Sequence, residues 1–244
     1  MIHMVICNQN QIIMKTNQTI SEFSLRKSAL IAGIGILLMA VLAPIANFAI
    51  LDTLILHRDA QGTYINIIKS ESQFRMAIFF FMLVAILDIL VAWALYMFLK
   101  PINSNLSLLA AWFRIIYATL LVAVLLYLVN ILQLISGAGT TVSPESEQLQ
   151  SQVLHLLEQF NRGWDLSMIV FGFHLLIIGY LIFRAGYMKR ILGILLILAS
   201  IGYLIDGFGQ ILSPEYHGTI ALYTFIGELV LIFWLLIKGG KVES

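Results

Sequence analysis

Five ionisable side chains stand inside long apolar stretches of this sequence, and they are the residues best placed to do chemistry. They are Asp88, Arg114, His174, Asp206 and Glu228. An ionisable group at the centre of a bilayer costs about 2.5–3.5 kcal/mol on the insertion scale. Each of the five is therefore expected to face the interior of a helix bundle rather than lipid.

The depth of each residue follows from its distance to the edge of its apolar stretch, at about 1.5 Å of helix rise per residue. This places Asp88 roughly 18 Å, and His174 and Glu228 roughly 15 Å, from the edge that carries most of the basic residues. Asp206 falls roughly 24 Å from that edge and Arg114 roughly 10 Å. Asp88, His174 and Glu228 thus share a depth near the midplane on three different stretches.

Two interpretations of these residues stay open at this point. In the functional interpretation, Asp88, His174 and Glu228 surround a polar cavity that opens toward Asp206. Arg114 lies below this cavity, nearer the edge that carries most of the basic residues. Such a cavity could bind a small molecule or an ion, or relay protons. In the structural one, Asp88 pairs with Arg114 across two antiparallel helices, His174 satisfies a backbone carbonyl, and Glu228 stays protonated.

No catalytic signature is visible. The sequence lacks the spacing of a zinc protease, of a serine hydrolase elbow and of a phosphate-binding loop. The histidines outside the five residues are scattered, so neither a metal site nor a cofactor is expected. Cys7 is the only cysteine, which excludes an internal disulfide and a thiolate metal cluster.

The elements that hold these residues are membrane helices. Hydrophobic residues make up 60% of the chain and charged residues 11%, against about 45–50% and about 25% in soluble proteins. Six apolar stretches approach the roughly 20 residues needed to cross a bilayer. An all-α, polytopic transmembrane bundle is therefore predicted, with the lipid bilayer as its partner.

The net charge of +1, without a basic block, argues against nucleic acid as a binding partner. The predicted spans are 28–51, 76–99, 108–136, 165–183, 191–212 and 218–237.

Basic residues predict the orientation. The flanks on one side carry nine Lys and Arg residues and those on the other side carry four. Because the cytoplasmic side collects basic residues, both termini are expected in the cytoplasm of a multi-pass protein of the cell membrane. The nine are Lys15, Arg26, Lys27, Lys100, Arg184, Lys189, Arg190, Lys238 and Lys241; the four are Arg58, Lys69, Arg75 and Arg162.

Two segments outside the spans have their own predictions. Residues 1–24 are polar and aperiodic, and are expected to form a disordered, dispensable tail before a membrane domain at 25–240. Residues 143–163 carry an apolar stripe at helical spacing. They predict an outer amphipathic helix that ends at Gly163 and lies on the membrane surface or over the bundle. Within the first span, Pro44 predicts a kink.

Several blocks resemble a bacterial membrane family known as domain of unknown function 4386. The resemblance covers roughly residues 24–240 and depends on the order of the blocks, because no single motif is chemically diagnostic. It implies a multi-pass bundle and no particular reaction. The family commonly has an acidic residue where this chain has Tyr117, and a proline where it has Met188. The blocks are Ala111–Arg114, Gly179–Arg184 with Ile191–Gly193, Gly202–Asp206, and Gly227–Leu229 with Trp234–Gly239.

Three classes of function therefore remain. The leading hypothesis is a non-enzymatic membrane protein that binds or transports a small molecule or an ion in a midplane cavity. The second is an intramembrane enzyme that acts on lipid through its Asp and His residues. The third is a structural or stress-related membrane factor whose buried polar residues only hold the fold together.

Overall fold

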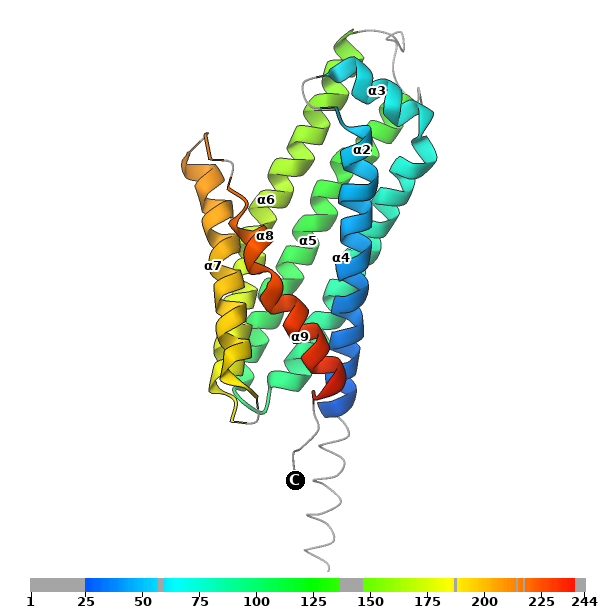
Figure 1. Cartoon of the computed structure of the whole chain (residues 1–244). Helices are drawn as coiled ribbons and strands as arrows, with labels where there is room; N and C mark the ends of the chain where they lie inside the picture. The colour runs from blue at the N-terminus through cyan, green and yellow to red at the C-terminus, as the bar shows by residue number, and fades with distance from the viewer. Residues whose placement is uncertain are drawn as a thin grey trace, which may run out of the picture.

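The computed structural model describes residues 25–56, 59–136, 147–186, 188–213, 215–216 and 218–239. The described residues are helical and contain no strand. Six helices are long and apolar enough to cross a membrane, which confirms the predicted polytopic all-α bundle (Figure 1). The expected tail at 1–24 lies outside the described residues. The six spans are Leu25–Leu54, Glu71–Leu99, Ser104–Ile135, Glu147–Arg184, Arg190–Leu212 and Ile220–Ile237.

The first span changes its helical winding at Pro44. An α-helix runs up to this residue, and the π-helix η1 (Ile45–Leu51) and the short α2 (Asp52–Leu54) follow it. Proline lacks a backbone N–H and disturbs the hydrogen bonds of the preceding turn. Wider π turns of this kind often occur at functional sites.

A short outer helix crosses one end of the bundle. It is α3 (Ala60–Lys69), and Asp59 begins it by accepting a hydrogen bond from the Gly62 backbone N–H at 2.8 Å. Ile67 on its inner side is fully buried. Figure 1 shows α3 above the ends of the long helices, opposite the end that holds the C-terminus.

Two long helices form a tight hairpin. They are α4 (Glu71–Leu99) and α5 (Ser104–Ile135). Asn103 caps α5 by accepting from the Leu106 backbone N–H at 3.0 Å, and the Ser107 hydroxyl donates to the Tyr96 carbonyl at 3.0 Å. The hairpin fixes the register of the charged residues on these two helices.

The fourth span corrects one prediction. Helix α6 (Glu147–Arg184) is one continuous helix of 38 residues, so the outer half does not lie across the bundle as a separate element. The apolar stripe of 143–163 is buried where it is described, but the helix end expected at Gly163 is wrong. A Cβ there would collide with Cγ1 of Val124 on α5, so this glycine permits close approach of two helices.

The last two spans complete the bundle. Helix α7 (Arg190–Leu212) packs closely on α6. The contact requires glycine at position 193, since a Cβ there would lie 2.6 Å from the Gly179 carbonyl oxygen. The sixth span is broken at Phe225 into α8 (Ile220–Thr224) and α9 (Ile226–Ile237). Figure 1 shows α9 running obliquely across the bundle toward the first helix.

An arginine joins the first helix to the last. The Arg26 guanidinium donates to the carbonyl oxygens of Leu235, Leu236 and Gly239 at 3.1, 2.6 and 2.7 Å. The carbonyls of Leu235 and Leu236 belong to the last turn of α9, and that of Gly239 lies two residues beyond it. Carbonyls at a helix C-terminus lack partners within the helix, and a cation there is electrostatically favourable. The two ends of the membrane domain are thereby held together.

Candidate functional site

A buried ion pair lies at the centre of the bundle. Arg114 Nη2 on α5 lies 2.7 Å from Asp88 Oδ1 on α4. The two residues are 4% and 2% exposed, so both charges are almost completely removed from solvent. A buried pair of this kind is tolerated only where the geometry is good and further hydrogen bonds satisfy the remaining polar atoms.

His174 on α6 supplies one of those further hydrogen bonds. Its Nε2 lies 3.1 Å from Arg114 Nη1, and its Nδ1 lies 2.8 Å from the Ala110 carbonyl oxygen. Because a guanidinium can only donate, Nε2 must accept and Nδ1–H must donate to the carbonyl. The imidazole is therefore neutral, and it holds one terminal nitrogen of Arg114 while Asp88 holds the other.

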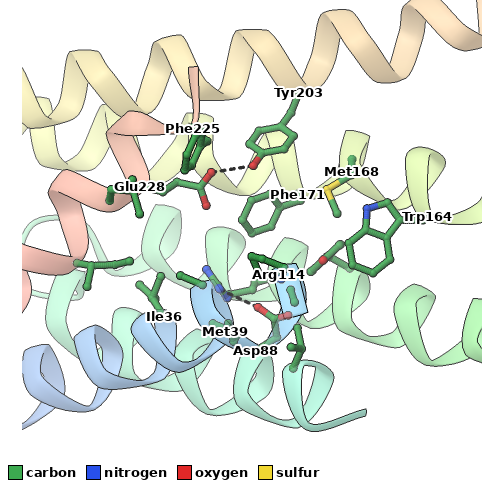
Figure 2. Close-up of a pocket in the computed structure, with 17 residues that line it drawn as sticks. Ile36, Met39, Asp88, Arg114, Trp164, Met168, Phe171, Tyr203, Phe225 and Glu228 are labelled. Atoms are coloured by element: carbon green, nitrogen blue, oxygen red, sulfur yellow. Dashed lines mark hydrogen bonds and ion pairs between the residues drawn. The ribbon is translucent and has the colours of Figure 1, made fainter. Parts of the chain in front are cut away.

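Glu228 on α9 has a different partner. Its Oε1 accepts a hydrogen bond from the Tyr203 hydroxyl at 2.9 Å, and its side chain is only partly buried. Phe171 lies between this pair and the ion pair, since its ring centroid is 5.4 Å from that of Tyr203 and 5.5 Å from Arg114 Cζ. Figure 2 shows this order from Glu228 through Phe171 to Asp88.

These groups line one cavity of about 240 Å³. All six spans contribute to its wall, including the two irregular points of the fold, Pro44 and Phe225. Most of the lining is apolar, and its polar atoms come from a few residues. They are Asp88, Arg114, Tyr117, Trp164, Tyr203 and Glu228.

Aromatic residues form much of this wall, and the sequence did not single them out as a group. Tyr117 packs on Phe171 with ring centroids 5.0 Å apart. Trp164 lines the same cavity. The aromatic residues recur in every apolar stretch, so only the packing of the helices separates those that line a cavity from those that face lipid.

A second cavity of about 300 Å³ adjoins the first and shares Trp164, Met168 and Tyr203 with it. Asp206 lines it and accepts from the Tyr216 hydroxyl at 2.8 Å and from the Ala221 backbone N–H at 2.7 Å. The hydrogen bond to this carboxylate raises the pKa of the Tyr216 hydroxyl. Asp206 therefore fixes the start of α8.

The five sequence-predicted residues fall into three places. Asp88 and Arg114 pair in the cavity wall, with His174 behind Arg114. Glu228 lines the same cavity from another helix, and Asp206 lines the neighbouring one. Arg114 contacts both Asp88 and His174.

The described residues offer no ready metal site. Within them, no three His, Cys, Asp or Glu side chains come together in a way that could hold an ion. The neutral His174 has both ring nitrogens occupied, which leaves neither lone pair nor proton for a substrate. The arrangement can hold a molecule by shape, aromatic contact and one carboxylate.

Comparison with known proteins identifies a family but no function for it. Residues 31–239 match the family described as Domain of unknown function (DUF4386). A relative from Archaeoglobus fulgidus, described as an uncharacterized protein, is 36% identical over 162 residues, which is 66% of this chain and 83% of the relative. No solved structure matches the chain. The match over most of its length shows that this chain belongs to the family Domain of unknown function 4386.

Proposed function

We propose that this protein binds a small organic molecule in its central cavity and transports it across the cell membrane, with both termini in the cytoplasm. The observation that carries the proposal is the cavity itself. It measures about 240 Å³, a little below the roughly 300–1,000 Å³ found for drug-sized ligand pockets, which suits a small molecule. Its apolar walls with a few polar groups are typical of such pockets.

The two interrupted helices support transport as well as binding. Irregular backbone at membrane depth is tolerated where it is buried in protein or lines a cavity, and broken helices beside a midplane site are common in transporters. Here the winding changes after Pro44 and the sixth span breaks at Phe225, and both residues line the cavity. The backbone at Pro44 and Phe225 can therefore bend during transport while the regular helices on either side keep their hydrogen bonds.

Photolabelling tests the binding site directly. A benzyl alcohol that carries a trifluoromethyl diazirine should label Tyr117, Phe171 and Tyr203 in purified protein in nanodiscs. The labelling should saturate and should be displaced by excess benzyl alcohol. Ala43→Phe, which places a ring into the cavity wall, should abolish it.

Lipid-facing residues provide the internal control. Trp93 and Trp112 are 51% and 59% exposed on the outside of the bundle. Their labelling should rise linearly with probe concentration and be the same in Ala43→Phe. Labelling confined to such lipid-facing residues would show that the cavity does not take small molecules.

Transport has its own measurement. Proteoliposomes should take up radiolabelled benzyltrimethylammonium, whose fixed charge slows its passage through a protein-free bilayer, faster than protein-free liposomes do, and Ala43→Phe should remove the difference. Saturable photolabelling without any protein-dependent uptake would reduce the function to binding.

A further inference from the structure

We infer that the molecule bound in the central cavity is an organic cation, an amine that carries apolar substituents, with Glu228 as its counter-ion. The inference rests on the proposed function and names the class of its ligand. It follows from the charges, the rings and the geometry of the wall.

The polar groups of the cavity leave one negative charge without a positive partner. Asp88 and Arg114 neutralise each other at 2.7 Å, and His174 behind them is neutral because Arg114 donates to its Nε2. Glu228 accepts only from the Tyr203 hydroxyl among the described residues. A carboxylate inside a membrane protein needs a cation or a proton to offset its charge, and a bound cation would supply it.

The rings around Glu228 favour an organic cation. Tyr203 donates to its carboxylate, and Phe171 and Phe225 lie in the same wall (Figure 2). Tyr117 also lines the cavity. A cation within about 6 Å of an aromatic face is attracted by the ring quadrupole, and aromatic cages with a carboxylate recognise ammonium groups. The apolar remainder of the wall suits the substituents of such an amine.

The same wall is poorly suited to other charged ligands. Calcium and magnesium prefer six or more oxygen ligands, whereas Glu228 is the one carboxylate of this cavity that no described cation neutralises. An anion would need Arg114, whose guanidinium is held by Asp88 and His174. Only its Nε lacks a hydrogen-bond partner among the described residues.

The neighbouring cavity adds two further carboxylates beside the central one. Asp165 and Asp206 line it, and it meets the central cavity at Trp164, Met168 and Tyr203. Neither aspartate is in an ion pair within the described part of the chain. Clefts lined by one sign of charge concentrate ions of the opposite sign, so this route favours cations.

Two competitors of equal shape test the inference. Benzyltrimethylammonium and neopentylbenzene differ by a quaternary nitrogen in place of a carbon. In nanodiscs, the ammonium compound should displace the diazirine benzyl alcohol from Tyr203 and Phe171 at a concentration at least ten-fold lower than the hydrocarbon. In Glu228→Gln, which keeps the shape and the acceptor oxygen for Tyr203, this preference should disappear.

Glu158→Gln is the matched control, because Glu158 is exposed on α6 outside the cavity lining, and it should keep the wild-type preference. Equal potency of the two compounds in the wild type, or an unchanged preference in Glu228→Gln, would overturn the assignment of an organic cation and leave the binding cavity standing. Absence of saturable labelling in the wild type would remove the cavity function as well. The wild-type comparison decides the question even if Glu228→Gln does not fold.

Discussion

At the scale of single residues, Arg114 organises the core. It contacts Asp88 and His174, and its guanidinium lies over the Phe171 ring at 5.5 Å. Removing one partner of such a buried pair is expected to destabilise far more than replacing both, because a lone charge remains in an apolar interior.

Arg114→Met should therefore lower stability strongly. The loss is expected to be about 3–5 kcal/mol, which corresponds to a fall of about 10 °C in the unfolding temperature for a chain of this size. Thermal unfolding in detergent, followed by size-exclusion chromatography, measures it. The double variant Asp88→Leu with Arg114→Met should recover most of the loss, and equal instability of the single and double variants would contradict this account.

The sequence predicted part of this arrangement. Because an ionisable side chain is costly in lipid, the sequence predicted that Asp88, Arg114, His174 and Glu228 face the interior. The structure places all four in or behind one cavity wall. Helix α5 begins at Ser104, four residues before the predicted span at 108–136, and the long side chain of Arg114 reaches both Asp88 and His174. Phe171 and Phe225 carry no polar group and would be equally favourable facing lipid, so the sequence could not show that they line the cavity.

At the scale of helices, glycine sets the distances. The α6–α7 contact leaves no room for a side chain at Gly193, where a Cβ would lie 2.6 Å from both the Gly179 carbonyl oxygen and the Phe183 backbone nitrogen. Close backbone approach of this kind depends on small residues. A change at this position must separate the two helices.

Gly193→Ala should consequently reduce thermal stability, by about 1–3 kcal/mol as for other overpacked sites. Gly186→Ala is the matched control, since nothing lies within 4 Å of a Cβ there, and it should unfold at the wild-type temperature. Both are read by the same detergent melting assay. A wild-type melting curve for Gly193→Ala would show that these helices can shift at little expense.

Helix boundaries were the least predictable feature at this scale. Gly163 has the sequence context of a helix end, with polar residues before it and an apolar run after it, yet α6 continues through it. A glycine that ends a helix and one that lets a neighbouring helix approach look alike in a sequence. Val124, which decides between them, lies 39 positions earlier on another helix.

At the scale of the whole molecule, the orientation in the membrane stays a prediction from the uneven distribution of basic residues. The structure adds suitable reporter positions, because Ser151 and Gly186 are exposed toward opposite ends of α6 and its connection to α7. Gln150, next to the first, is buried and would be a poor choice.

In a Cys7→Ser background, Ser151→Cys should react with a membrane-impermeant maleimide in intact cells, and Gly186→Cys should react only after lysis. The reason is that the basic flanks place the Gly186 end in the cytoplasm. The reverse pattern would invert the topology, and labelling of both positions in intact cells would indicate mixed insertion.

The Arg26 contact has a consequence for how the protein is made. Its three acceptors lie more than 200 positions later in the chain. The first helix is therefore synthesised long before α9, and the face that packs on α9 stays uncovered until that helix has been made. Premature termination before residue 235 would leave this guanidinium without its carbonyl partners. An unfinished chain would keep that face exposed, and membrane quality-control proteases are expected to degrade it.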